Sequence, residues 1–224
     1  MLAMPKPILI LRLEGVLQSW GERARWDFRD SNTMPTKSGV VGLLACAMGL
    51  PRGSERIIEL SKSLEMGVRA DRNGVIFQDF HTVTGERDFL FNAEGKKRVG
   101  GATIITPRQY LQDAYFTVAL YANEELLNAC ATALNNPVWS VYLGRKSCVP
   151  SRPIFDELTN EYSSILEALE SHPLCMRPSK NQTFLCEYED KSGNILRRDE
   201  IQFNAARNYD YRRVKCTAIE IQEV

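Results

Sequence analysis

The segment 85–107 constrains the fold of this 224-residue chain more than any other stretch. It is 23 residues long and holds four glycines and three consecutive cations, Lys96, Lys97 and Arg98. A connection of that length without secondary structure is uncommon inside a compact domain, unless it is functional or disordered. Because the segment does not fit a compact core, we predict an arm that projects from the domain. A mobile surface loop is the alternative.

The residues before this arm predict a strand followed by two helices. Residues 7–13 carry Ile and Leu on both faces, which is typical of a strand buried on both sides. Residues 36–50 predict a helix that ends before Pro51. Ser54 is a suitable cap for a second helix. Two strands at 67–70 and 75–83 are then expected to form a hairpin, since Asn-Gly between apolar runs is a strong hairpin signal.

The residues after the arm complete a mixed pattern. They predict a strand at 115–121, a helix capped by Asn123, and strands at 183–189 and 213–221. Strands and helices in this order favour an α+β sandwich, with helices on one face of an antiparallel sheet. The ferredoxin-like or RNA-recognition-motif arrangement is the leading candidate. We therefore expect one unit built from residues 1–84 and 108–224, with 85–107 as an insertion.

Composition excludes several classes of protein. No apolar run reaches the ~18 residues of a membrane span, and Arg12 and Glu14 interrupt the first run before it resembles a secretion signal. The six cysteines form no CxxC pair, so buried reduced thiols are expected. His172, Cys175 and Cys186 lack the four ligands and tight spacing of a structural zinc site, so no metal is expected.

Charge is balanced overall but segregated locally. Twenty-eight basic residues match 28 acidic ones, which argues against a protein that finds nucleic acid by bulk electrostatics. Residues 197–215 nevertheless hold six cations against three acids, and residues 144–153 hold no acid at all. Such a chain has room for one basic face and for another face that meets different partners.

Aromatic and basic residues alternate in three places. One group lies within residues 20–29, with Trp20 at its start; a second pairs Arg108 with Tyr110; the third spans residues 142–147. Such sets suit single-stranded RNA, because arginines meet phosphates and aromatic rings stack on bases. A place in the core is the ordinary alternative for each aromatic residue.

Two motifs suggest chemistry without establishing it. His81 follows Asp79 and Phe80 near the end of a predicted strand, and is a candidate general base for metal-free RNA cleavage, with Lys96, Lys97 or Tyr110 as partner. Alternatively, it holds the base of the arm through a hydrogen bond. The Lys37-Ser38 pair lacks the glycines of a phosphate loop. It remains a candidate phosphate contact at a helix N-terminus.

Seven short motifs, spread over nearly the whole chain, together resemble one known family. They lie at residues 8–21, 35–39, 79–83, 108–111, 113–120, 142–148 and 198–200. Their order and spacing are similar to those of the Cas-five family, in the form found in type I-E CRISPR Cascade complexes. The match departs most at residues 23–34, inside the arm, and at 151–180.

The resemblance implies a ferredoxin-like palm and a protruding thumb, which would be the arm at 85–107. Family members cap one end of the complex and hold the 5′ handle of the CRISPR RNA, while their thumb pushes into the duplex of RNA and target DNA. They contact the backbone and large subunits of Cascade. The implied RNA-binding residues are Arg108, Tyr142, Arg145, Lys146, Lys37, Ser38, Trp20 and Arg87. The implied thumb residues are Lys96, Lys97 and Arg98.

The expected function is therefore that of a non-catalytic, RNA-binding assembly subunit in antiviral defence. We expect it to act in the cytoplasm, without cofactor, metal or membrane, and to meet target DNA through the complex. The alternative is a metal-free endoribonuclease that processes precursor CRISPR RNA with His81, because type I-C relatives cleave this RNA themselves.

Overall fold

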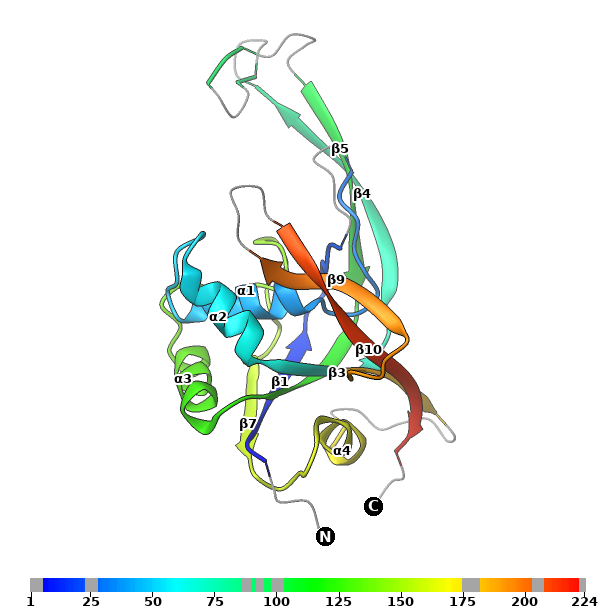
Figure 1. Cartoon of the computed structure of the whole chain (residues 1–224). Coiled ribbons are helices and arrows are strands. Elements are labelled where there is room, and N and C mark those ends of the chain that lie inside the picture. The colour runs from blue at the N-terminus through cyan, green and yellow to red at the C-terminus, as the bar shows by residue number, and fades with distance from the viewer. Residues whose placement is uncertain are drawn as a thin grey trace.

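The computed structural model describes residues 6–22, 28–85, 90–91, 95–97, 103–174, 182–202 and 208–221. Within these ranges the chain folds into two antiparallel sheets and four helices (Figure 1). The helices are α1 (Lys37–Ala47), α2 (Glu55–Ser63), α3 (Glu124–Asn135) and α4 (Ile165–Ser171). The strands of the larger sheet are β1 (Ile8–Glu14), β3 (Glu65–Arg72), β6 (Tyr115–Tyr121), β7 (Phe155–Thr159), β8 (Thr183–Glu189), β9 (Ile195–Gln202) and β10 (Asn208–Glu220). The smaller sheet holds β2 (Leu17–Gln18), β4 (Val75–Thr84) and β5 (Thr103–Gln112).

The larger sheet has the order β7-β1-β6-β3-β8-β10-β9 and is covered on both faces. On β1, Leu9, Leu11 and Leu13 belong to the main core, which includes residues of α1, α2 and α3. Ile8 and Ile10 point the other way, into a second cluster that α4 covers. The expected α+β class and the doubly buried first strand are confirmed. The expectation of helices on one face only is wrong, because α4 packs on the opposite face.

Local capping explains where the helices begin. Thr36 accepts a hydrogen bond from the Gly39 N–H at 3.3 Å, and α1 starts one residue after it. Asn123 caps α3 by accepting from the Leu126 N–H at 2.8 Å. Ser54 occupies the cap position of α2 without a side-chain hydrogen bond. The predicted positions of these three helices are thus confirmed.

The hairpin expected between residues 67–70 and 75–83 is wrong. β3 pairs with β6 on one side and β8 on the other, so neither of its edges is left for β4. Gly74, with φ at +70°, lies in the turn where the chain leaves β3 and enters the second sheet. Asn73-Gly74 does form a turn, but this turn connects strands of two different sheets instead of two strands that pair with each other.

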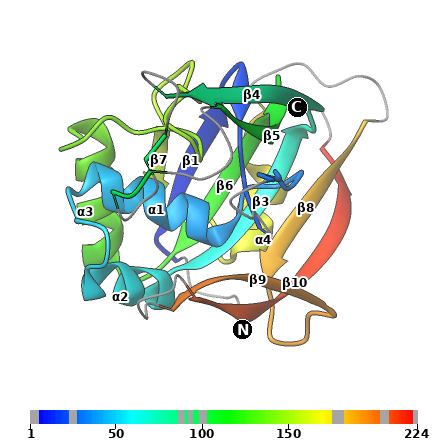
Figure 2. The same ribbon diagram turned by 90° about the horizontal axis from the view of Figure 1, so that it is seen from above.

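The β4–β5 hairpin extends well beyond the rest of the molecule (Figure 1). Figure 2 looks down on the molecule from the side of this hairpin. The two strands of the hairpin pair without a register shift from Val75–Gln112 at the base to Thr84–Thr103 near the tip. Residues 103–107 of the predicted arm therefore belong to β5. In the tip, Phe91 and Lys97 form an antiparallel bridge. The predicted candidates Arg87 and Arg98 lie outside the described residues.

The described residues bear on two expectations from composition, one about the cysteines and one about membrane-spanning segments. Of the five cysteines described, all are free; Cys130, Cys148 and Cys186 are buried, and Cys216 is exposed. Burial raises the pKa of Cys130 to about 11. It is also the main cause of the raised pKa of Cys186, which is about 12. Among the helices described, none is long and apolar enough to span a membrane.

Candidate nucleic-acid interface

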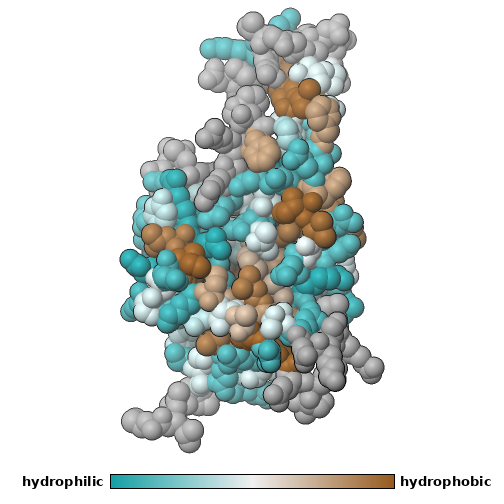
Figure 3. Space-filling model, turned by 90° about the vertical axis from the view of Figure 1, so that its right-hand side faces the viewer, coloured by the Kyte–Doolittle hydropathy of each residue, from teal (hydrophilic) through white to brown (hydrophobic). Residues whose placement is uncertain are grey.

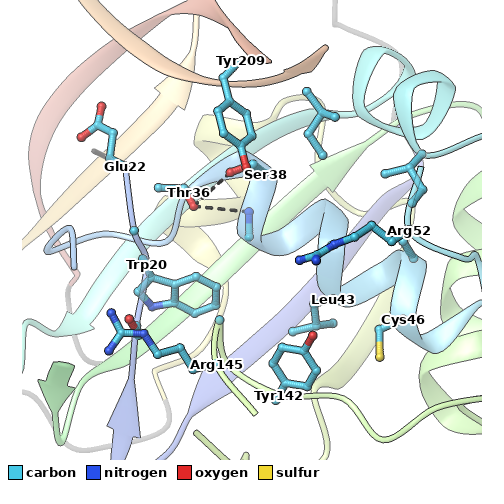
Figure 4. Close-up of a pocket in the computed structure, with 18 of the residues that line it drawn as sticks. Trp20, Glu22, Thr36, Ser38, Leu43, Cys46, Arg52, Tyr142, Arg145 and Tyr209 are labelled. Carbon is cyan, nitrogen blue, oxygen red and sulfur yellow. Dashed lines mark hydrogen bonds between the residues drawn. The ribbon is translucent and has the colours of Figure 1, made fainter. Parts of the chain in front are cut away.

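A hollow of about 680 Å³ opens along α1, from Ser38 to Cys46. Figure 4 shows Trp20 and Arg145 on one side of it, Tyr142 and Arg52 on the other, and Tyr209 near the start of the helix. The floor is formed by small residues of α1, among them Gly42, where an added Cβ would meet nothing within 4 Å. We call this space the aromatic groove, because Trp20, Trp139, Tyr142 and Tyr209 all line it.

A second hollow of about 460 Å³ adjoins the aromatic groove and is strongly basic. It is lined by Arg29, Arg52, Arg108, Tyr142, Gly144, Arg145, Lys146 and Ser147. Five of these eight residues are cations and none is acidic, so we call it the basic rim. Five lining residues, Tyr142 and Arg145 among them, are shared with the groove. An anionic ligand on the rim would therefore extend directly into an aromatic hollow.

Arg145 is fixed in place but retains hydrogen-bonding capacity. Its Nη2 donates to the carbonyls of Arg29 at 3.1 Å and Asp30 at 3.3 Å. Its guanidinium lies 4.6 Å from the centroid of the Tyr110 ring. Its buried Nη1 has no hydrogen-bond partner among the described residues. A buried donor of this kind is costly unless a ligand or water pairs with it.

A tight turn of the backbone presents Arg145 and Lys146 to the rim. Leu143 donates to the carbonyl of Cys148 at 2.8 Å, and Cys148 donates to the carbonyl of Arg145 at 2.8 Å. Gly144 has φ at +88°, and a Cβ there would lie 1.7 Å from the Ser19 carbonyl oxygen. The turn can therefore pack against the segment after β2 only because residue 144 is glycine.

Arg108 and Tyr110 reach the site from the base of the projecting hairpin. The segment around Arg29 runs along β5, since Arg29 donates to the Pro107 carbonyl at 3.0 Å and Gln109 donates to the Arg29 carbonyl at 2.8 Å. Arg108 donates from Nε to the Thr106 hydroxyl at 3.2 Å. Two sequence segments that are far apart thus supply neighbouring cations.

The sequence-predicted residues fall into two groups in space. Arg108, Tyr142, Arg145 and Lys146 all line the basic rim. Ser38 lines the aromatic groove, and its hydroxyl lies 3.5 Å from that of Thr36.

Lys37 does not belong with these residues. Its side chain is 3% exposed and pairs with Glu200 at 2.6 Å and Glu189 at 3.1 Å. Its backbone N–H donates to Asp199 at 2.7 Å, so the helix N-terminus already holds a carboxylate. Burial raises the pKa of Glu189 against the lowering effect of Lys37. We remove Lys37 from the candidate contacts, because its ammonium is held inside an ion-pair network.

Trp20 lines the groove with a buried ring. It is 1% exposed, and its indole Nε1 donates to Gln18 at 3.0 Å. It therefore shapes the wall of the groove but offers little surface on which a base could stack. Tyr142 is only half-buried and lines both hollows, which makes it the better stacking platform.

His81 has one close polar partner among the described contacts. Its Nδ1 lies 3.3 Å from Asp79 Oδ2, beside it on β4. Its cross-strand neighbour is Thr106, and Tyr110 lies four positions further along β5, about 13 Å away at the rise of a strand. Tyr110 is also buried. It therefore cannot serve His81 as the predicted catalytic partner.

The described residues bring together no group of three or more side chains that would hold a metal ion. His172 instead pairs through Nε2 with Asp156 at 2.8 Å, and its Nδ1 lies 3.4 Å from the Tyr162 hydroxyl. Cys175 lies outside the described residues.

The sequence did not identify two residues that line the site, and it did not mark a third, Arg29, as a candidate contact. Arg52 and Tyr209 line the hollows although no motif singled them out. Arg29 was noted only as part of an aromatic and basic group. Arg52 follows the end of α1 in a turn, where a lone arginine gives no signal without knowledge of the groove that it faces.

Comparison with known proteins gives consistent results. The sequence profile of the CRISPR-associated protein family Cas5 matches residues 8–215. The Cascade subunit CasD of Escherichia coli strain K12 is 36% identical over 159 residues, which are 66% of this chain and 69% of that protein.

Two solved structures are similar over nearly the whole chain. One, from a CRISPR RNA-guided surveillance complex, has a TM-score of 0.79 at 33% identity and covers 96% of this chain and 90% of its own. The other, described as a Cas protein, has a TM-score of 0.71 at 35% identity, with coverage of 95% and 94%.

Proposed function

The chain belongs to the Cas5 family of CRISPR-associated proteins, and from this we propose that it is a non-catalytic subunit of a Cascade-type surveillance complex. Its role there is to hold the 5′ handle of the CRISPR RNA at one end of the complex. The backbone and large subunits are its proposed partners, and target DNA reaches it through the assembled particle. The cytoplasm is the proposed place of this antiviral activity.

The observation that carries the proposal is the basic rim beside the aromatic groove. Five cations without a carboxylate attract a phosphate backbone. The Nη1 of Arg145, which no described residue pairs with, is a donor that a phosphate oxygen would satisfy. An unstacked base next to that phosphate would enter the groove and meet Tyr142. This combination suits a single strand, whose bases are free to turn away from the backbone.

We also propose a ferredoxin-like palm for the central part of the fold. The elements β1, α1 with α2, β3, β6, α3 and β7 follow the β-α-β-β-α-β order of that arrangement. Their four strands are adjacent in the sheet as β7-β1-β6-β3, and all their pairings are antiparallel. The β4–β5 hairpin is inserted between the second and third of these strands, as a thumb would be.

A direct test measures binding of handle RNA by the chain assembled with its partner subunits. Tyr142→Ala should weaken binding by about tenfold, since stacking of one base is worth ~1–3 kcal/mol. Tyr211→Ala is the matched control, because Tyr211 is exposed on β10 and lines neither hollow. Unchanged affinity in Tyr142→Ala, or an equal loss in both variants, would remove the aromatic groove from the proposal.

The second candidate function is metal-free cleavage of precursor RNA, and the Asp79–His81 pair is the observation that favours it. Incubation of the purified chain with repeat RNA, without metal, separates the two candidates. We expect intact RNA with the wild-type chain. Specific cleavage that His81→Ala abolishes would make this chain the processing nuclease instead.

A further inference from the structure

Two charged residues near the start of α1 are buried. Figure 3 shows hydrophilic residues, in teal, spread over the surface of one side of the molecule, where charged side chains are usually found. Asp199 and Arg212 are instead only 2% and 7% exposed. A buried charge is costly unless it is paired and hydrogen-bonded, so the partners of these two residues show what holds them there.

Asp199 connects β9 to two other elements through both oxygens of its carboxylate. Arg212 of β10 donates from Nε to Oδ1 at 2.7 Å and from Nη2 to Oδ2 at 3.0 Å. Oδ2 also accepts from the backbone N–H of Lys37 at 2.7 Å, where α1 begins. A carboxylate is favourable at that end of a helix. The strands β9 and β10 are thus tied to the helix that forms the floor of the aromatic groove.

Contacts of the next two residues strengthen this connection. Glu200 pairs with the Lys37 ammonium at 2.6 Å, and the Ile201 N–H donates to the Ser61 hydroxyl of α2 at 3.3 Å. β9 is the last strand in the order of the described sheet, and it lies beside α1 and α2 (Figure 1). These side chains therefore fix how the edge of the sheet sits on the two helices.

A β-bulge lies at the same place. The ladder of β9 and β10 shifts register between Asp210 and Arg212, where two residues of β9, Asp199 among them, oppose one residue of β10. In a regular strand, Tyr209 and Arg212 would point to opposite faces, because they are three residues apart. The bulge lets Arg212 reach Asp199 while Tyr209, which pairs with Ile201, lines the aromatic groove. Bulges re-aim side chains in this way beside functional sites.

We infer that Asp199 is a positioning residue for the RNA site: by binding Arg212 and the N-terminus of α1, it holds the bulge that turns Tyr209 into the aromatic groove. This inference rests on the proposed function, since it takes the groove to bind RNA. Figure 4 shows the Tyr209 ring near the start of α1, apart from the ring of Tyr142. The two rings therefore offer separate surfaces on which bases of a single strand can stack.

A double-mutant cycle tests whether Asp199 acts through Tyr209. Affinity for handle RNA is measured on the complex assembled from the full chain and its partner subunits. Tyr209→Ala should lower it by about tenfold, as expected for the loss of one stacking surface. Asp199→Ala should lower it by about fivefold to tenfold, because a misplaced ring loses at most what a deleted ring loses. In the Tyr209→Ala background, Asp199→Ala should change the affinity by less than about twofold.

Two results of this cycle would overturn the inference. One is unchanged affinity in Asp199→Ala, and the other is an equal loss with and without the Tyr209 ring. If the chain with Asp199→Ala does not assemble, Asp199→Asn takes its place in the cycle. Asparagine has the same shape but only one acceptor oxygen for the donors of Arg212 and Lys37, so the same results are expected and the same ones would overturn the inference.

Asp71→Ala is the matched control, because Asp71 is 1% exposed and also pairs with a buried arginine. It accepts from Arg69 at 3.3 Å, and Arg69 donates to the His172 carbonyl at the end of α4, on the opposite face of the sheet. Both variants should lower the midpoint of thermal unfolding, since each leaves a buried cation without its carboxylate. Only Asp199→Ala should weaken RNA binding. An equal loss of affinity in Asp71→Ala would make reduced stability the cause and contradict the inference.

Failure of this inference is separable from failure of the proposed function. If Tyr142→Ala weakens RNA binding while Tyr209→Ala and Asp199→Ala do not, the inference is wrong and the proposed function stands. If none of the three variants binds RNA more weakly, the aromatic groove does not hold the RNA and both are wrong.

Discussion

Arg145 combines three kinds of contact that a lysine cannot reproduce. Its guanidinium stacks on Tyr110, donates to two backbone carbonyls and leaves Nη1 for a ligand. We predict that Arg145→Ala lowers the affinity for handle RNA by tenfold or more and that Arg145→Lys restores little of it. Fluorescence anisotropy on the assembled complex measures both. Arg198→Ala is the control, since Arg198 stacks on Tyr211 and lines neither hollow. Full rescue by lysine would mean that only charge matters.

Gly144 has a structural role that its neighbours depend on. Two features exclude a side chain at residue 144. Its φ is positive, and an added Cβ would lie 1.7 Å from the Ser19 carbonyl oxygen. We predict that Gly144→Ala lowers the free energy of unfolding by about 2–4 kcal/mol. Gly53→Ala separates the two causes, because Gly53 also has a positive φ but its Cβ would meet nothing within 4 Å. Equal stability losses in a urea titration would show that the Ser19 contact is unimportant.

The contrast between Lys37 and Arg145 shows which site residues a sequence can identify. Arg145 lies in a stretch without acids, so local composition already indicated a free positive charge. Lys37 also looked available, but its carboxylate partners Glu189 and Glu200 are 152 and 163 positions away. The residues next to Lys37 in the sequence give no indication of a pairing with residues so far away. The sequence shows the charge of a residue, but it does not show whether distant residues bury that charge in an ion-pair network.

At the scale of single elements, α1 supplies the floor of the aromatic groove, and its glycines differ in their surroundings. A Cβ on Gly39 would lie 2.8 Å from the Trp20 ring, whereas one on Gly42 would meet nothing. We predict that Gly42→Leu fills the groove and weakens RNA binding by at least tenfold while the midpoint of thermal unfolding changes little. Gly39→Leu should lower that midpoint clearly. Normal RNA affinity in Gly42→Leu would exclude the groove floor from the binding site.

Elements defined by local pattern could be predicted, and those defined by distant pairing could not. β6 and β8 were expected within the bounds observed, because alternation and flanking turns specify them. The predicted hairpin between β3 and β4 does not form, since β6 and β8 occupy both edges of β3. β9 was missed because its mixed run, ILRRDEIQ, places a charged residue, Asp199, in a buried position, where it pairs with Arg212 of β10.

On the scale of the whole molecule, the described strands of the projecting hairpin leave out residues 95–101, because β4 ends at Thr84 and β5 begins at Thr103. The ladder between β4 and β5 continues to Thr84–Thr103, so loss of residues 95–101 leaves every described pair of that ladder in place. We predict that this deletion spares folding, measured by thermal unfolding, but reduces target-DNA binding of the assembled complex. The cations Lys96 and Lys97 are lost with it. Wild-type target affinity after the deletion would mean that the tip is only a connecting loop.

The balanced net charge makes salt dependence informative for this chain. With 28 cations and 28 acids the chain has no net charge, so the proposed RNA affinity must come from local groups such as the five cations of the basic rim. If all five contact phosphates, the logarithm of affinity should fall with the logarithm of salt at a slope of about −3.5 for a single strand. Arg108→Ala should reduce that slope by about 0.7, because one phosphate contact is lost. The titration requires the assembled complex and handle RNA, with Arg198→Ala as the cation that leaves the slope unchanged. A slope near zero in the wild-type complex would contradict phosphate binding at the rim. A steeper slope that Arg108→Ala does not alter would locate the phosphate contacts elsewhere in the particle.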